Sequence, residues 1–393
     1  MKLHSLNLGS IKKYGMLIAL FVLIVFFYFV TEGTMLLPAN ITNIIQQNGY
    51  ILILAIGMLF CILTGNIDLS VGSIVAVVGA IAGYTIITLQ LPVALGIIIS
   101  LIMGTLIGAL QGYFIAYLKI PAFIVTLAGM LIFRGITMVI LSGATIAPFP
   151  ESFQFVAAGF ILPNQTLSLF GQESNIFALI FGILFCVAYI LFELKNRKAK
   201  IKYGFETGSD LNFYGRIALV VVAFNFITFK LSLYKGIPFI LLLLIVLVLI
   251  YSFIAVKTIP GRHVYAIGGN EKAARLSGVK TQKVMFWVYA NMGLLAAIAG
   301  IVVAGRLNAA TPKAGNGYEL DAIASCFIGG ASASGGIGTV VGAVIGGFVM
   351  AVLNNGMSIE GIGTDWQQII KGVVLVIAVL FDIKSKSKAS NAN

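Results

Sequence analysis

Charged residues are scarce in this sequence. Only 10% of its 393 residues are Asp, Glu, Lys or Arg, whereas 60% are hydrophobic and the mean hydropathy is +1.05. Apolar runs cover residues 15–30, 178–192, 237–256 and 372–381 with its flanks, and roughly 17 to 25 such residues span the hydrocarbon core of a bilayer. The runs do not alternate apolar with polar positions, which excludes an outer-membrane barrel. The predicted fold class is therefore all-α, a polytopic membrane helical bundle.

Histidine and cysteine are also rare. The two histidines are His4 and His263, so a His-based metal site or nucleophilic site is nearly excluded, and we expect no metal. The three cysteines, Cys61, Cys186 and Cys326, all fall in apolar segments without paired spacing. We interpret them as small buried hydrophobic residues rather than as a disulfide framework.

Positive charge is present, at a formal net value of +12, but it is clustered. Most Lys and Arg residues lie at the two ends of the chain, in a basic loop at residues 194–216, and in and around a polar loop at residues 257–283. Cytoplasmic loops of membrane proteins carry such an excess. The pattern predicts that both termini and both loops are cytoplasmic, and it does not indicate a nucleic-acid surface.

Two segments are expected to be helix pairs that break inside the membrane. One begins with Asn-Gly-Tyr at residues 48–50 and breaks at "TGNIDLSVGS"; the other begins with Asn-Gly-Tyr at 316–318 and breaks at "GGASASGG". The recurrence predicts two broken-helix pairs related as an internal repeat. Transporters are commonly built from repeats, with discontinuous helices beside the substrate. The alternative is that two glycine-rich membrane helices are alike by composition alone.

The polar loop contains "GGNEKAARLSGVK". Asn270 fits a helix N-cap and Gly278 fits the residue that ends the helix. Two small alanines keep the predicted helix thin, and charged residues surround it. A thin, charged helix between two membrane spans suits insertion into a groove of a cytoplasmic partner; a solvated connecting loop is the alternative. The residues that would make this contact are Gly269, Asn270, Glu271, Ala273, Ala274, Arg275 and Gly278.

A resemblance that covers nearly the whole chain favours the partner-docking helix over the solvated loop. "GRHVYAIGGNEKAARLSGVK" resembles the coupling segment of sugar ABC-importer permeases, the ribose, xylose and multiple-monosaccharide group. "GNIDLSVGSIVAVVGA", "PAFIVTLAGMLIFRGI", "LNAATPKAGNGYELDAIASCFIGGASASGGIGTVVGAVIGG" and "NNGMSI…WQQIIKG" are similar to other motifs of that family. The length, with an extra pair of spans near residues 217–256, is most similar to the xylose and multiple-monosaccharide branch.

The resemblance implies a single transmembrane permease domain over residues 1–393 that translocates monosaccharides of the xylose, arabinose, galactose or glucose type across a bacterial inner membrane. It implies a separate cytoplasmic ATPase, which would bind ATP and magnesium, and an extracytoplasmic sugar-binding protein. It also implies a second permease copy, for which a homodimer is the simpler choice. The chain has no G-x-x-x-x-G-K-[ST] phosphate loop, so we expect no cofactor in this chain and no enzymatic activity. The identity of the transported sugar stays open.

Polar residues in the first break are candidates for the translocation path. Asp68 lies between two apolar runs, where a carboxylate is expensive and functional by default. Asn66, Ser70 and Ser73 surround it, and neutral hydrogen-bonding groups suit a sugar. The alternative is that Asp68 caps a helix that begins near Ser70.

Other candidates lie further along the chain. Arg134 is a lone cation in an apolar run, and we expect it to pair with Asp68; Glu319 and Asp321 are alternative partners, and snorkelling to the interface is another outcome. Asn354 and Asn355 are expected to line the path.

Trp366 and Lys371 are expected to be interface anchors at the last helix. The competing function is a secondary transporter or channel for a small polar solute, which would work without an ATPase. Such proteins usually place more ionisable groups at the membrane midplane than this sequence has.

Overall fold

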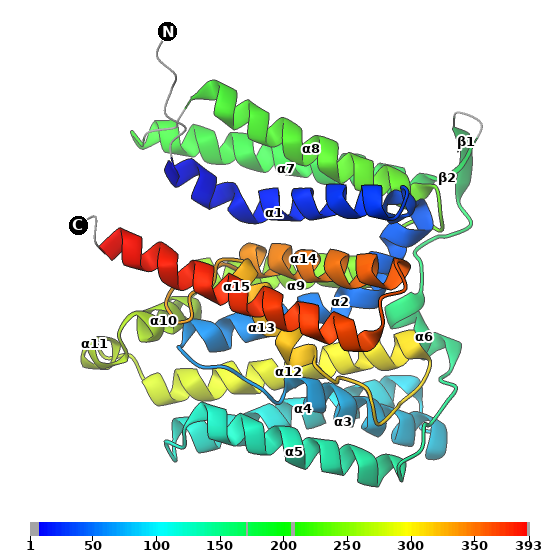
Figure 1. The fold of residues 1–393 in the computed structure, drawn as a ribbon, viewed down its shortest axis with the longest axis vertical. Coiled ribbons are helices and arrows are strands. Elements are labelled where there is room, and N and C mark those ends of the chain that lie inside the picture. The colour runs from blue at the N-terminus through cyan, green and yellow to red at the C-terminus, as the bar shows by residue number, and fades with distance from the viewer. Residues whose placement is uncertain (1–7, 170–171, 206–208, 391–393) are drawn as a thin grey trace.

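The computed structural model describes residues 8–169, 172–205 and 209–390, and they form a bundle of helices (Figure 1). Nine helices in these ranges are long and apolar enough to cross a membrane, which confirms a multi-pass helical membrane protein. The first half of the chain contains α1 (Leu8–Val30), α2 (Pro38–Leu63), α3 (Val71–Gly83), α4 (Val93–Ala116), α5 (Ala122–Leu141) and α6 (Glu151–Ala158), with short turns η1 (Thr34–Leu36) and η2 (Tyr84–Thr88).

A small antiparallel hairpin, β1 (Thr166–Leu169) and β2 (Gln172–Asn175), separates the two halves. The second half contains α7 (Ile176–Lys202), α8 (Asp210–Ser232), α9 (Phe239–Lys257), α10 (Ile259–Gly269), α11 (Glu271–Leu276), α12 (Thr281–Leu307), α13 (Tyr318–Ile328), α14 (Val340–Ile359) and α15 (Thr364–Ser390). The predicted basic loop 194–216 is shorter than expected because both flanking helices extend into it; its residues 206–208 lie outside the described residues.

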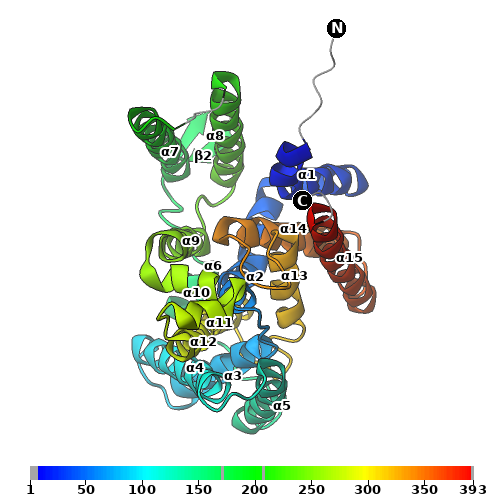
Figure 2. The same cartoon turned by 90° about the vertical axis from the view of Figure 1, so that its left-hand side faces the viewer.

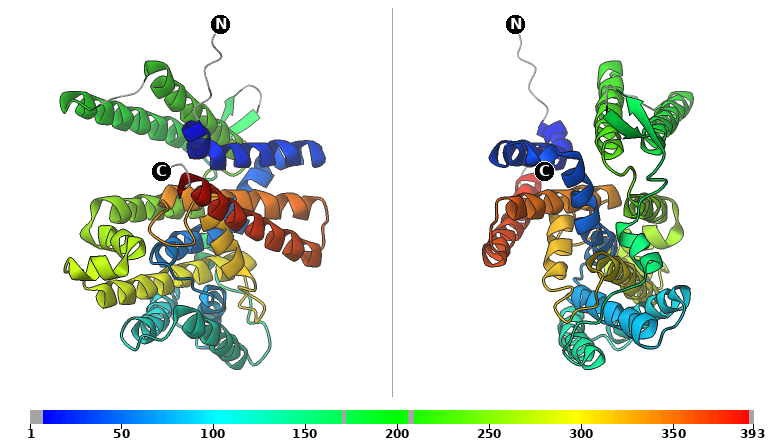
Figure 3. Two further views of the ribbon diagram at one scale, coloured as in Figure 1. Left: turned by 60° about the vertical axis from the view of Figure 1, so that its left-hand side comes forward. Right: turned by 90° about the vertical axis from the view of Figure 1, so that its right-hand side faces the viewer.

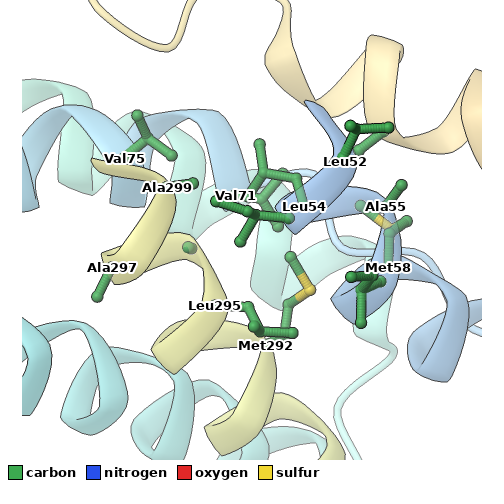
Figure 4. Packing of buried hydrophobic residues seen from close by; sticks show 14 of the residues in the cluster. Leu52, Leu54, Ala55, Met58, Val71, Val75, Met292, Leu295, Ala297 and Ala299 are labelled. Atoms are coloured by element: carbon green, nitrogen blue, oxygen red, sulfur yellow. The ribbon is translucent and has the colours of Figure 1, made fainter. Parts of the chain in front are cut away.

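The centre of the bundle is α2, whose most apolar stretch is 83% buried. A helix that is hydrophobic on all sides is stable only when other helices surround it. Side chains of α2, α3 and α12 interdigitate there, including Leu54, Met58, Val71, Met292 and Leu295 (Figure 4). By contrast, α4, α5, α7, α8 and α9 are at most one-third buried along their apolar stretches, and their large exposed apolar side chains suit contact with lipid.

Glycines allow α4 and α12 to approach closely. An added Cβ on Gly108 would meet the backbone of Gly293 at 2.8 Å, and a Cβ on Gly293 would collide with the carbonyl oxygen of Gly104. Small residues are common at helix contacts in membranes because they permit this approach. The pair also fixes the position of α12, which leads directly out of the polar loop.

The two predicted breaks are present. We call residues 64–70, between α2 and α3, the first break, and residues 329–339, between α13 and α14, the second break. The helices around them differ in length: α2 has 26 residues before the first break, whereas α13 has only 11 before the second. In addition, α2 begins ten residues before the Asn-Gly-Tyr triplet. The internal repeat therefore stays a prediction.

One pair of helices stands apart from the rest. The hairpin of α7 and α8 lies beside the bundle in two views (Figures 2 and 3), and its helices are joined by stacked Phe185 and Phe224 rings 3.9 Å apart. The extra spans expected near 217–256 do not pack as a pair, since α8 packs on α7 while α9 packs on α2 and α6.

The ends of the bundle are distinct. The start of α1, the end of α15, the junction of α7 with α8, and both α10 and α11 lie at one end, which we call the α11 end (Figure 1). The hairpin β1–β2 and α6 lie at the opposite end, the α6 end. The segments that the charge pattern places on one side of the membrane thus share one end of the structure.

Candidate functional site

The polar loop at residues 257–283 folds into α10 and α11. Asn270 caps α11 as predicted, because its Oδ1 accepts a hydrogen bond of 3.0 Å from the backbone N–H of Ala273. Gly278 adopts a positive φ of 86° just after the helix, a conformation that glycine permits. Thr258 similarly caps α10 through the N–H of Gly261. The loop is therefore a defined structure rather than an irregular connection.

The two alanines of α11 do not share one environment. Ala273 is exposed, whereas Ala274 is only 5% exposed and packs against the bundle. The outward surface instead carries Leu276, which is 90% exposed, next to the exposed Arg275. Sequence reasoning missed Leu276, although an isolated leucine in a charged helix is a visible signal. The aliphatic side chain of Leu276 is therefore fully accessible to a partner.

The inner surface of α10 meets the end of α2 and the second break at a glycine contact. The N–H of Gly336, in the second break, donates a hydrogen bond of 2.9 Å to the carbonyl oxygen of Leu63, the last residue of α2. Gly268 of α10 lies directly against this bond, so an added Cβ would collide with the Leu63 oxygen and with the Gly336 nitrogen. We call Leu63, Gly268 and Gly336 the glycine junction.

Tyr265 makes a second connection from α10. Its Oη donates a hydrogen bond of 2.7 Å to the carbonyl oxygen of Gly338. Partial burial raises the pKa of the Tyr265 phenol above its usual value, so the group stays neutral and remains a donor. The polar loop is thus joined to the second break at two points on one side of α10.

Four polar groups organise the first break. Oδ1 of Asp68 accepts hydrogen bonds from the backbone N–H of Ser70 at 2.8 Å and from its hydroxyl at 2.6 Å. Ser73 Oγ donates to the Ser70 carbonyl at 2.7 Å, and Gln111 of α4 donates to Ser70 Oγ at 2.8 Å. Asp68, Ser70 and Ser73 are each at most 1% exposed. The geometry is close to the predicted alternative in which Asp68 caps a helix, although Asp68 bonds within the turn that leads into α3 rather than to the helix itself. The three residues are enclosed.

Asn66 is the half-buried member of the predicted set. Its Nδ2 donates to the Thr64 carbonyl at 3.1 Å and lies 3.7 Å from the sulfur of Met285 in α12. Unlike its three enclosed neighbours, it retains exposed surface.

The predicted ion pair between Arg134 and Asp68 is wrong. Nη1 of Arg134 donates to the carbonyl oxygens of Ala314 at 2.6 Å and Pro312 at 3.4 Å, in the segment that precedes α13. Glu319, one of the alternative partners, also attracts the guanidinium electrostatically. Asp68 is enclosed against Ser70 instead. Arg134 therefore fastens α5 to the segment before α13.

The two asparagines of α14 have different roles. Asn355 and Asn40 exchange two amide hydrogen bonds, of 2.9 and 3.0 Å, which join α14 to α2. Asn355 is 5% exposed, so it acts as a link between helices in this conformation. Asn354 is half-buried, and its side chain lies near Asp321.

Sequence reasoning missed a cluster of polar and aromatic groups around Asp321. The rings of Tyr50 and Tyr318 stack with centroids 3.8 Å apart, and Tyr50 Oη lies 3.5 Å from Oδ2 of Asp321. Lys371 forms an ion pair with Asp321 at 3.1 Å, so the expectation that it is a simple interface anchor is wrong. Lys371, Tyr50 and Tyr318 are partly exposed while Asp321 is 1% exposed. A buried carboxylate needs such a partner.

Comparisons with known proteins agree with this architecture. The family described as "Branched-chain amino acid transport system / permease component" matches residues 40–192 and 175–379. The chain is 40% identical over 387 residues to the xylose transport system permease protein XylH of Escherichia coli (strain K12), covering 98% of this chain and 95% of the relative. No solved structure matches the chain.

Two further relatives extend the similarity. The XylH protein of Haemophilus influenzae is 39% identical over 387 residues, which cover 98% of this chain and 99% of the relative. The ribose import permease protein RbsC of Escherichia coli (strain K12) is 34% identical over 347 residues, which cover 88% of this chain and 86% of the relative. These matches confirm the resemblance seen in the sequence motifs. The chain therefore belongs to the branched-chain amino acid transport system / permease component family, among its sugar transport permeases, and is a transport subunit rather than an enzyme.

Proposed function

We propose that this chain is the permease subunit of an ATP-driven importer that moves monosaccharides across a bacterial inner membrane. Its similarity to xylose and ribose permeases supports a sugar as substrate. The sequence has no phosphate loop of its own, so ATP and magnesium would bind to a separate ATPase. A sugar of the xylose, arabinose, galactose or glucose type is the proposed cargo.

The observation that carries the proposal is the glycine junction. A permease without an ATPase domain must receive force from a partner through a surface that is connected to its moving parts. Here α10 and α11 form a capped, outward-facing unit whose inner side contacts the end of α2 and the second break. Displacement of α10 would push on the end of α2 and on the second break together.

The proposed docking surface is the exposed side of α11. Leu276 would fill an apolar groove of the ATPase, and the charged Glu271 and Arg275 would fix the orientation. Asn270, Ala273 and Gly278 would shape the helix and its ends rather than bind directly, whereas Gly269 has open space beside it and would tolerate a side chain. Ala274 would hold the helix on the bundle, because its side chain is buried.

The rest of the assembly follows from this orientation. With the ATPase at the α11 end, the α11 end and both termini are cytoplasmic, and an extracytoplasmic sugar-binding protein would dock at the α6 end. A second copy of the chain would complete the pore. The path would use half-buried groups, namely Asn66, Asn354, Tyr50, Tyr318 and Lys371, since amide and aromatic groups suit a sugar. The enclosed Asp68, Ser70, Ser73 and Asn355 would support it.

Two matched variants test the docking surface. Leu276→Asp places a charge on the exposed leucine of α11, and Leu307→Asp places the same charge on a leucine that is 52% exposed at the other end of α12. We expect co-purification with the partner ATPase to be lost in Leu276→Asp and kept in Leu307→Asp. Loss in both variants would indicate general damage, and retention in both would reject α11 as the docking surface.

Sugar uptake into vesicles separates this function from its competitor. The assembled permease, ATPase and binding protein should accumulate xylose or a related sugar only with ATP inside. Equal sugar flux through the permease alone would establish a channel or secondary transporter instead.

A further inference from the structure

A groove at the α11 end is not used by the proposed transport cycle. Its volume is about 670 Å³, and α9, α10 and α12 form its walls with Phe60 of α2. These helices lie next to one another along one side of the bundle (Figure 2). The volume is within the range of about 300 to 1,000 Å³ that is typical of small-molecule sites.

The deep wall of the groove is apolar. It includes Phe60, Tyr251, Ile254, Val264, Val284 and Val288. Two polar groups stand beside this apolar surface, and Tyr251 Oη donates a hydrogen bond to Oδ1 of Asn291. Most of this wall offers no partner to polar atoms, and an acyl chain matches it.

The rim of the groove is basic. Lys280 and Lys283 line it and are exposed, whereas no Asp or Glu is among the lining residues. Neither lysine belongs to an ion pair in the described part of the chain. Trp287 lies four residues after Lys283 on α12 and is 58% exposed. Lysines beside an exposed indole are typical of the level of lipid headgroups.

We propose that the groove binds one anionic phospholipid from the leaflet at the α11 end. Its phosphate would lie between Lys280 and Lys283, and one acyl chain would lie along Tyr251, Ile254 and Val288. Basic pockets between membrane helices at the cytoplasmic side bind acidic headgroups because their cationic side chains attract the negative charge of the headgroup. A soluble anion would leave the apolar wall in contact with water.

The position gives the lipid a structural consequence. Pro260, Gly261 and Val264 of α10 line the groove, and so does Gly278, which follows α11. The bound lipid would therefore support the polar loop from the membrane side while its outward face stays free for a partner. The inference depends on the chain being a membrane protein and does not depend on the transported solute.

Tryptophan fluorescence can test the site because the chain has two tryptophans. In the Trp366→Phe variant, Trp287 is the remaining reporter, and it lines the groove. The full-length variant is reconstituted in phosphatidylcholine vesicles that contain increasing brominated phosphatidylglycerol or brominated phosphatidylcholine. A lysine near an acidic surface contributes about fivefold in affinity, so two lysines predict about a 25-fold preference for the acidic lipid.

Two control proteins make the result specific. Lys280→Gln/Lys283→Gln should reduce the preference nearly to one, whereas Lys198→Gln/Lys202→Gln, which removes equal charge from exposed positions on α7, should retain it. The Trp287→Phe chain, which reports from Trp366 at the start of α15, should show no such preference.

Several outcomes would overturn the proposal. Equal quenching of Trp287 by the two brominated lipids would show that the groove does not select an anionic headgroup. An undiminished preference in the Lys280→Gln/Lys283→Gln protein would assign it to general surface charge. Displacement of the acidic lipid by added glycerol phosphate would show that a soluble anion is the true ligand.

Discussion

A methyl group at Gly268 provides the sharpest test of the glycine junction. The Gly268→Ala side chain would collide with the Leu63 carbonyl oxygen and the Gly336 nitrogen, which are backbone atoms and cannot rotate away. The next residue is a natural control, because an added Cβ on Gly269 has nothing within 4 Å and its backbone has no positive φ. The same added methyl group thus collides with backbone at Gly268 and meets open space at Gly269.

The expected magnitude follows from overpacking. Forcing an extra methyl group into a packed site costs about 1–3 kcal/mol. If the junction changes between the two conformations of a transport cycle, this cost shifts their equilibrium by about 5- to 150-fold. We therefore expect Gly268→Ala to reduce sugar uptake by at least about fivefold and Gly269→Ala to leave it near normal.

The assay needs two readouts. ATP-driven uptake is measured in vesicles together with co-purification of the ATPase, because Gly268 lies on the inner side of α10 and the partner would dock outside. Reduced uptake with retained ATPase binding would support transmission through the junction. Normal uptake by a well-folded Gly268→Ala protein would refute it.

Three other predictions test separate features of the structure. Asp68→Asn should keep a hydrogen-bond acceptor and cost little thermal stability, whereas Asp68→Ala should cost about 1–3 kcal/mol; equal melting temperatures would contradict the turn-stabilising role. Lys371→Met should destabilise the protein by about 3–5 kcal/mol because it leaves the carboxylate of Asp321 buried and unpaired, and adding Asp321→Asn should restore most of that loss in a thermal unfolding assay. Because the native cysteines are buried, thiol labelling of intact cells should modify Gln165→Cys and leave Ser277→Cys unmodified; the reverse would invert the proposed topology.

Local features were predictable from the sequence. The cap at Asn270 and the glycine after α11 depend on neighbouring residues, and both are confirmed. The two breaks also follow local rules, since glycine and serine clusters interrupt helices. The membrane class followed from composition alone, because so few charges cannot cover a soluble protein of this length.

Contacts between distant residues were not predictable in the same way. Lys371 pairs with Asp321 across 50 residues, and nothing in either neighbourhood identifies the other partner. The predicted pairing of Arg134 with Asp68 failed because Arg134 donates to backbone carbonyl groups, which leave no mark in a sequence. The recurring triplets did contain a signal, since their tyrosines Tyr50 and Tyr318 stack, but recurrence alone did not predict contact.

Under the proposed function, the glycine junction gives a reason for the polar loop to be rigid. The second break is already bonded to the end of α2 through Gly336 and Leu63, directly before the first break. A flexible loop would absorb a partner's motion before it reached that point. The capped helices α10 and α11, fixed by Tyr265 and by close backbone contact at Gly268, would pass the motion on. The capped charged helix is therefore best understood as one side of a connection whose other side is a glycine contact inside the bundle.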